Sequence, residues 1–396
     1  MGFILFDDKC RDDLLPLTFT RPVAELRVGI LRIREKWEKR LKMRASFLTQ
    51  DYLQEKYAVR IAATNLLING SVLPDETLIE EMQGLTPGKA LRKGDVLLAV
   101  STNRGSFDIN DSSLLESASE YEGSVARIDR PWKIFSLNGQ EIASDFELLT
   151  RGRKSASLSK TVNVVQGERV FIEEGFRGEH FTINASSGPI YLGKDSEIME
   201  GSVIRGPFAL CEHATVKMGS KIYGPTTIGP HSKAGGEINN SVLTGFSNKG
   251  HDGFLGNAVI GEWCNLGADT NNSNLKNNYT EVKIWNYPAG RFMNTGLQFC
   301  GLIMGDHSKC GISTMFNTGT VVGVSANIFG AGFPRNFVPS FTWGGAAGLT
   351  VYQPDKAIET MERVMKRRGI QLSSSDRDIF SHLFRETEKY RERLEK

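Results

Sequence analysis

The strongest candidate for chemistry in this chain is a histidine framed by glycines. His251 lies between Gly250 and Gly253 in the segment 247–274. Acyl transfer from a thioester to an amine needs the amine neutral, and a neutral imidazole near pH 7 can remove its proton. Backbone amides of a glycine-rich segment can donate hydrogen bonds to the thioester oxygen. A lone histidine is more often a loop residue without a role, but no other histidine here has such a setting, which favours His251 as a base.

Asparagines are frequent on either side of this histidine. Each of them fits a turn or corner equally well, but neutral amides also suit sugar hydroxyls. The segment contains no group of residues with the spacing of metal ligands, so we predict no zinc site. The asparagines near this histidine are Asn239, Asn240, Asn265, Asn271, Asn272 and Asn274, and those selected as substrate contacts are Asn239, Asn240, Asn265 and Asn274.

A period of six residues precedes the histidine and predicts the fold that carries it. Neither a helix nor a simple alternating strand demands this period, whereas a triangular parallel β-helix does, with one inward aliphatic residue on each flat side and a small residue at each corner. The phase is lost at Ala234, resumes at Ile260, is interrupted by an insertion at about 271–299 and returns at Met304. We predict a left-handed parallel β-helix over residues 169–345. The first run of aliphatic positions is Leu192, Ile198, Ile204, Leu210, Val216, Ile222 and Ile228.

The regions before and after the repeat differ from it. Residues 1–150 alternate apolar strands at 3–6, 65–70 and 95–100 with helical stretches such as 27–42, which predicts an α/β, Rossmann-like domain. Residues 151–168 are expected to be a linker, although their basic, serine-rich start could also contact phosphate. Residues 346–396 are expected to form helices that cover the β-helix or a neighbouring subunit rather than a membrane.

Composition limits the classes of partner. The 48 Lys and Arg residues nearly balance the 46 Asp and Glu residues, so there is no overall attraction to nucleic acid or anionic membranes. Five scattered cysteines without a CxxC pair favour a reducing compartment. The sequence has no apolar run of the roughly 18 residues that span a bilayer, and its start reads as a buried strand rather than a signal peptide. We therefore expect a cytoplasmic protein.

The segment KGHDGFLGNAVIGEWCNLGADT resembles the acetyltransferase signature of bifunctional UDP-N-acetylglucosamine pyrophosphorylase/glucosamine-1-phosphate acetyltransferases. The similarity covers about residues 190–330 and extends to sugar-phosphate nucleotidyltransferases with β-helix acetyltransferase tails. It implies a homotrimer that binds acetyl-CoA between adjacent β-helices, with His251 as the catalytic base. Further roles that it implies are sugar-phosphate contacts for Phe254, amino-sugar contacts for Asn265 and Asn274, and acetyl-CoA contacts for Ala268 and Gly305.

One departure concerns the substrate phosphate. Asn239, followed by Asn240, stands where the bacterial bifunctional enzymes of this family place a phosphate-binding lysine. Lys249, two residues before His251, could compensate. The resemblance therefore specifies the reaction type better than the sugar phosphate.

The N-terminal region resembles the sugar nucleotidyltransferase domain of the same family less closely. The stretches LLPLTFTRPVAELRVGI (14–30) and INGSVLPDETLIEEM (68–82) carry the likeness. It implies Mg²⁺ and UTP, with Arg11, Arg21 and Asn69 as nucleotide contacts. Against this, DDKCRDD (7–13) has no glycine to approach phosphates, and Ser71 replaces the metal-binding aspartate. Together the regions resemble an alternative, Bacteroidetes-type version of the bifunctional enzyme.

Three functions remain open from the sequence. The first is a bifunctional enzyme of UDP-N-acetylglucosamine synthesis that acetylates glucosamine 1-phosphate and transfers UMP from UTP. The second is an acetyltransferase whose N-terminal domain is not catalytic. The third is a regulatory or scaffold subunit, against which the setting of His251 argues because a scaffold needs no base there.

Overall fold

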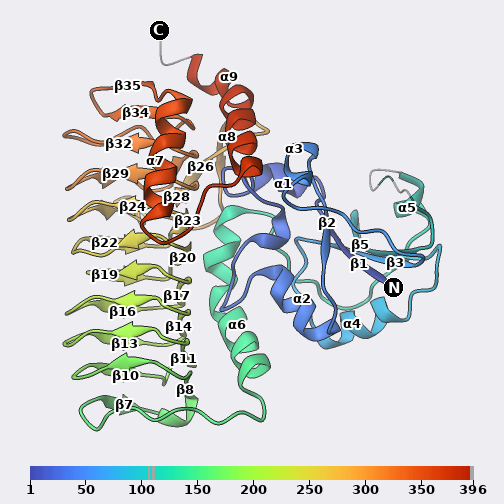
Figure 1. Cartoon of the computed structure of the whole chain (residues 1–396), viewed down its shortest axis with the longest axis horizontal. Coiled ribbons are helices and arrows are strands. Elements are labelled where there is room, and N and C mark those ends of the chain that lie inside the picture. The colour runs from blue at the N-terminus through green and yellow to red at the C-terminus, as the bar shows by residue number, and fades with distance from the viewer. Residues whose placement is uncertain (106–107, 109–111, 393–396) are drawn as a thin grey trace. The chain divides into compact units, whose positions relative to one another are not determined.

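The computed structural model describes residues 1–105, 108 and 112–392 of the chain (Figure 1). Two compact units are present. The first contains Met1–Leu14, Thr18–Leu26 and Leu31–Arg130, and the second contains Leu15–Leu17, Arg27–Ile30 and Pro131–Lys396. This division falls before the helix 131–150, whereas the sequence placed the boundary after it.

The first unit is built on a six-stranded mixed sheet. Its strand order is β2-β1-β3-β5-β4-β6, with β1 parallel to β2 and β3, and β5 antiparallel to β3 and β4. The three strands predicted here are confirmed as β1, β3 and β5, and the α/β class is confirmed with them. The strands are β1 (Gly2–Phe6), β2 (Ser46–Leu48), β3 (Asn65–Asn69), β4 (Ala90–Lys93), β5 (Val96–Thr102) and β6 (Ser119–Glu120). The helices are α1 (Cys10–Asp13), η1 (Val23–Glu25), α2 (Ile33–Leu41), α3 (Asp51–Gln54), α4 (Glu76–Gln83) and α5 (Ser112–Glu116).

The helix predicted at 27–42 is shorter than expected. It begins only at Ile33, and residues 27–30, which belong to the second unit, are not helical, with Gly29 at a φ of 76°. There the backbone N–H of Gly29 donates to Asn138 and that of Ile30 to Asp145, at 2.8 Å each. Buried side-chain acceptors on helix α6 (Pro131–Thr150) thus take the hydrogen bonds that a helix would have used.

The second unit is a parallel β-helix with three faces, visible in Figure 1 as stacked coils. The predicted left-handed parallel β-helix is confirmed. The first face contains β7 (Asn163–Val165), β10 (Thr182–Asn184), β13 (Val203–Arg205), β16 (Lys221–Tyr223), β19 (Glu237–Asn239) and β22 (Phe254–Gly256). The second contains β8 (Val170–Ile172), β11 (Ile190–Leu192), β14 (Phe208–Leu210), β17 (Thr226–Ile228), β20 (Val242–Gly245), β23 (Val259–Glu262), β28 (Ile303–Met304), β31 (Val321–Val322) and β33 (Phe337–Val338). The third contains β9 (Arg177–Gly178), β12 (Glu197–Ile198), β15 (Thr215–Val216), β18 (Lys233–Ala234), β21 (Asn248–Lys249), β24 (Asn265–Leu266), β29 (Lys309–Cys310), β32 (Asn327–Ile328), β34 (Thr342–Gly345) and β35 (Gly348–Val351).

The core of the β-helix is the set of residues that produced the six-residue period. Those from Leu192 to Ile228 are all at most 1% exposed, and they stack in columns through the parallel pairing of successive coils. Helix α6 packs along the outside of the second face, against β14, β17, β20 and β23. The interior is therefore dry and continuous, so a polar side chain on an inward position is an exception that needs a reason.

The insertion at 271–299 begins with β25 (Asn271–Asn272), which pairs with β30 (Met315–Phe316). It continues into an antiparallel hairpin of β26 (Lys283–Asn286) and β27 (Arg291–Asn294). After the hairpin the chain returns to the stacked faces, where β28 pairs with β23 and β29 with β24. The predicted interruption of the repeat is thus a hairpin that leaves the coil and returns to it.

Helices follow the last coil, as expected. They are α7 (Pro354–Lys366), α8 (Ser374–Glu386) and α9 (Glu388–Arg391). Ser373 caps α8 by accepting a hydrogen bond from the backbone N–H of Asp376. Phe380 of α8 packs edge-on against His307, so α8 covers part of the β-helix. Nowhere in the described ranges is there a helix both long and apolar enough to cross a bilayer.

Candidate functional site

His251 lies at the corner that leads from the third face of the β-helix to the first, between β21 and β22. We call the turn Gly250–Gly253 and its neighbours in adjacent coils the His251 corner. The histidine is exposed. Within the described part of the chain its ring makes no hydrogen bond or ion pair, so it is open to a substrate or to a second chain.

The corner one coil below is shorter, and this sets the shape of the site. Ala234 and Ile238 are both inward residues four positions apart, whereas Val216 and Ile222, like Lys249 and Leu255, are six apart. Gly235 and Gly236 make this short corner. A Cβ on Gly236 would lie 2.8 Å from Cα of Asp252 and 2.9 Å from the carbonyl oxygen of His251. The loss of the repeat at Ala234 is therefore the feature that lets the histidine turn sit directly on the coil below.

Lys249 occupies an inward position beside this turn. Its register partner in the coil below is Ala234, and its side chain is only 2% exposed. The amine donates to the carbonyl oxygens of Gly235 at 3.0 Å and His251 at 2.6 Å. Burial lowers the pKa of the Lys249 amine to about 8, although the nearby carboxylates of Asp252 and Asp269 act in the opposite direction. This corrects the expectation that Lys249 reaches the substrate phosphate, because its amine is directed into the corner.

A backbone donor lies one coil above the histidine. The N–H of Asp269 donates to the carbonyl oxygen of Asp252 at 3.0 Å, which brings residues 268–269 onto the His251 corner. The N–H of Ala268 has no acceptor among the residues that the structure describes, whereas its carbonyl accepts from Ser313 at 2.7 Å. Ala268 is thus the available donor for an oxyanion at this corner.

Gly305 does not share this position. It lies at the corner from the second face to the third, which we call the aromatic corner, and its N–H donates to Val322 at 2.8 Å. The rings of His231, Phe246 and Trp263 stack along this corner with centroids 4.7 and 4.2 Å apart. Next along the corner is His307, only 6% exposed and in contact with α8. Within one chain, Gly305 thus lies at a different corner from His251 and its N–H is already used, and its contact with acetyl-CoA stays a prediction.

The predicted substrate residues divide between two corners. Phe254 opens β22 directly after the histidine turn, and Asn265 accepts a hydrogen bond from Asn248, three residues before His251, at 3.4 Å. Asn239 and Asn274 lie instead at the corner from the first face to the second, which we call the asparagine corner. There Asn274 donates to Asn257 at 2.8 Å, and Asn239 donates to Tyr223 at 3.4 Å.

Asn240 follows Asn239 at the asparagine corner in the left-handed conformation, with φ of 44°. The whole of β19 separates it from the His251 corner. Two asparagines not selected from the sequence support β22, since Asn271 accepts from the N–H of Phe254 at 2.7 Å and Asn272 from that of Gly256 at 2.8 Å. These amides replace the strand pairing that β22 lacks above it. Within one chain, then, only part of the predicted site comes together.

In the first unit, polar residues gather where the parallel strands end, which is the edge where α/β sheets bind ligands. Asp8 follows β1, and its carboxylate accepts from Asn69, at the end of β3, and from Arg127, at 2.8 Å each. Asp7 accepts from Thr49 at 2.6 Å and from the N–H of Val23 at 2.8 Å. Burial raises the pKa of the Asp7 carboxyl to about 6, against the lowering effect of these hydrogen bonds. The sequence singled out Asn69 but missed Asp8 and Arg127.

The two arginines predicted to bind nucleotide are buried. Arg11 is 4% exposed and donates to the carbonyl of Thr18 at 3.1 Å and the hydroxyl of Tyr52 at 2.5 Å. Arg21 is 6% exposed. Both guanidinium groups are thus largely enclosed by the protein, and their contacts with a nucleotide stay predictions.

The residues at this edge do not fit Mg²⁺ as they stand. Both carboxylates that follow β1 already accept hydrogen bonds from protein donors. Across residues 1–105, 108 and 112–392 there is no group of three His, Cys, Asp or Glu side chains that could hold a metal ion.

Residues 3–154 match the family model described as sugar nucleotidyl transferase. Over 236 residues the chain is 27% identical to a bifunctional sugar-1-phosphate nucleotidylyltransferase/acetyltransferase of Sulfurisphaera tokodaii, covering 58% of this chain and 52% of that protein. Over 196 residues it is 29% identical to the bifunctional protein GlmU of Methanocaldococcus jannaschii, covering 50% and 41%. The chain thus spans about half the length of the curated relatives it matches. The predicted resemblance to bifunctional nucleotidyltransferase/acetyltransferases is confirmed.

Among solved structures, the polySia-specific acetyltransferase NeuO matches 53% of this chain and 99% of its own, at 14% identity and a TM-score of 0.25. A TM-score this low does not establish a shared fold. The β-helix is established by its own strand pairing.

Proposed function

We propose that the β-helix transfers an acetyl group from acetyl-CoA to the amino group of a hexosamine 1-phosphate, with glucosamine 1-phosphate as the first candidate. The observation that carries the proposal is the pairing of an exposed imidazole, His251, with the unused N–H of Ala268 one coil above it. A base and an oxyanion donor at one corner are what acyl transfer to an amine requires.

In the proposed reaction the amine nitrogen attacks the thioester carbonyl while His251 takes the proton that the nitrogen loses. The N–C bond forms, and the oxyanion of the tetrahedral intermediate is stabilised by the Ala268 N–H. The C–S bond then breaks, and the proton passes from the imidazolium to the leaving thiolate. The products are an N-acetylated sugar phosphate and coenzyme A.

The test follows free thiol released from acetyl-CoA with glucosamine 1-phosphate, and with glucosamine 6-phosphate and glucosamine as comparisons. We expect His251→Ala to lower the rate by about 10²–10⁴-fold, the usual contribution of a general base. His382→Ala is the matched control, since this histidine lies on α8, away from the His251 corner, and is 40% exposed beside Glu386 at 3.2 Å. Full activity of the His251 variant, or an equal loss in the control, would overturn the assignment.

A homotrimer forms part of this proposal because one chain does not complete the predicted site. The asparagine corner and the His251 corner lie at opposite ends of the first face, so a second copy would be needed to bring both against one substrate. We expect light scattering to give three times the chain mass of 43.9 kDa. A monomer with full activity would show that one chain suffices.

Nucleotidyl transfer by the first unit is the second candidate, favoured by the match of residues 3–154 to the family model. It is tested on the full chain by pyrophosphate release from UTP and N-acetylglucosamine 1-phosphate with Mg²⁺. Release that persists in His251→Ala would assign this activity to the first unit. Thiol release without pyrophosphate release would indicate an enzyme that only transfers acetyl groups. If neither product were released, a non-enzymatic subunit would be favoured.

A further inference from the structure

A cavity of about 860 Å³ opens beside the insertion hairpin, at the upper end of the asparagine corner. Its wall is formed by the hairpin β26–β27, by the coil around β33 and by α9, all within the second unit. Neither the His251 corner nor Ala268 contributes to it. The proposed acetyl transfer therefore does not account for this cavity.

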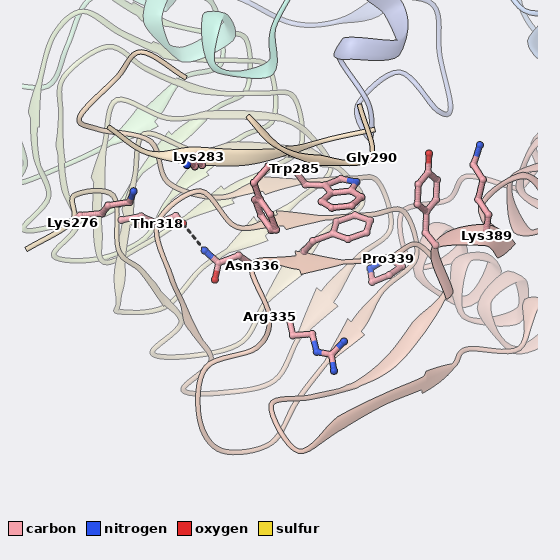
Figure 2. A pocket seen from close by; sticks show the side chains of 12 residues that line it. Lys276, Lys283, Trp285, Gly290, Thr318, Arg335, Asn336, Pro339 and Lys389 are labelled. Atoms are coloured by element: carbon pink, nitrogen blue, oxygen red, sulfur yellow. Dashed lines mark hydrogen bonds between the residues drawn. The ribbon is translucent and has the colours of Figure 1, made fainter. Parts of the chain in front are cut away.

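Aromatic rings form the floor of the cavity. Trp285 and Phe337 stack with their centroids 4.3 Å apart and an interplanar angle of 10°, and Tyr390 stands edge-on to Phe337 at 6.0 Å (Figure 2). Phe292, on the other strand of the hairpin, is 40% exposed. A flat ring system in a ligand could stack on these aromatic side chains. The contact area would be large, and the side chains would lose little conformational freedom on binding.

The described charged residues in the wall of the cavity are all cations. In Figure 2 Lys389 lies at the end opposite Lys276, Lys283 lies between Lys276 and Trp285, and Arg335 lies below the rings. None of the three forms an ion pair with any residue that the structure describes. Lys276, also in the wall, donates to the backbone carbonyl of Glu281 at 2.6 Å. Among the residues that the structure describes, no Asp or Glu lines the cavity, so its positive charge favours an anion with several charges.

We propose that this cavity binds a nucleotide: a phosphorylated planar heteroaromatic whose base stacks on the Trp285 side and whose phosphates meet Lys283, Arg335 and Lys389. The volume is within the range of small-molecule sites, and an apolar floor with a few charged groups is their usual composition. Two sources share this chemistry, a free nucleoside diphosphate and the nucleotide end of coenzyme A.

The experiment is calorimetric titration of the full chain with UDP and with CoA, beside uridine, pantetheine and pyrophosphate. We expect at least one nucleotide to bind at least tenfold more tightly than each of the three fragments. Its affinity should fall as the salt concentration is raised. UDP alone would identify a nucleoside diphosphate site, and CoA alone the nucleotide end of the acyl donor. Either result supports the proposal when the cavity variants weaken that binding, because acetyl transfer and nucleotidyl transfer elsewhere in the chain would also bind these compounds. Pyrophosphate binding as tightly as either nucleotide, or no binding of either nucleotide at millimolar concentration, would overturn it.

Variants distinguish binding in this cavity from nonspecific attraction of an anion to a positively charged surface. The pair Lys283→Gln with Arg335→Gln should weaken nucleotide binding at least tenfold. The control pair, Arg205→Gln with Lys221→Gln, removes two exposed cations from the first face in lower coils and should leave binding unchanged. Equal weakening by both pairs would refute a built site. His251→Ala should bind nucleotide normally, so a failure of the acetyl-transfer proposal would not count against this one.

Discussion

The side-chain amine of Lys249 donates a hydrogen bond of 2.6 Å to the backbone carbonyl oxygen of His251. The lysine itself is an interior residue, stacked between Ala234 below and, through the pairing of β21 with β24, Leu266 above. A buried cation in an apolar column is costly unless its hydrogen bonds are made, and here two carbonyl oxygens of the His251 corner make them. The amine therefore fixes the backbone on which the proposed base is carried.

Replacing Lys249 with Met should separate stability from activity. A methionine of similar length removes the buried charge, so the variant should fold and be at least as stable as the natural protein near pH 7. Its His251 corner loses the tie to the amine, and we expect thiol release to fall about 10- to 100-fold through misplacement of the base. Lys233→Met, on the exposed side of β18, is the matched control. A destabilised variant with unchanged activity would contradict a positioning role.

The pH dependence of stability gives an independent check on the same amine. Its pKa is about 8 in the folded protein, below its ordinary value of 10.5, so the unfolded chain binds more protons between these values. The unfolding free energy of the natural protein should therefore rise relative to Lys249→Met as pH increases from 8 to 10.5, and the deficit should be largest below pH 8. Denaturant titrations of both proteins at matched pH measure it. Parallel pH curves would show that the amine is not buried.

The β-helix could be predicted because its interior demands one aliphatic residue at a fixed spacing, and Leu192 to Ile228 satisfy this without a gap. Its exceptions were harder to interpret. Lys249 resembles a phosphate-binding lysine in the sequence, but it points inward because the steps from Ala234 to Ile238 and from Ile238 to Leu243 are shorter than six residues. Gly305 and Ala268 look equivalent in sequence, but they differ in which corner they occupy and in whether their N–H is used.

Local patterns also failed where distant partners decide the structure. The segment 27–32 has helical spacing, yet Gly29 and Ile30 donate to acceptors on α6 more than a hundred residues later, and the helix begins only at Ile33. Asp8 and Arg127 are separated by 119 residues and form one ion pair at 2.8 Å. The position of Asp8 directly after an apolar strand was the one signal available for it.

Asp7 should make the first unit sensitive to pH in the acidic range. Its pKa of about 6 exceeds the ordinary value of 3.8, so the folded state binds more protons between these values. The stability that this proton provides is present below pH 3.8 and is lost as pH rises through 6. Asp7→Asn removes the titration and should gain unfolding free energy relative to the natural protein between pH 4 and 6.5. A difference that stays constant over this range would rule out a buried carboxyl at residue 7.

Two glycines with the same backbone conformation test how the His251 corner is built. Gly236 and Gly219 have φ of 74° and 65° at equivalent corners of successive coils. Alanine costs about 1–2 kcal/mol at either because of its left-handed backbone. A Cβ at Gly219 meets no atom within 4 Å, whereas at Gly236 it meets Cα of Asp252 at 2.8 Å. We expect Gly236→Ala to lose about a further 1–3 kcal/mol through overpacking, and to lower thiol release at least tenfold in folded protein because the histidine turn must move. Gly219→Ala should show only the backbone cost, with normal catalysis. Similar stability and activity in the two variants would mean that the short corner does not support His251.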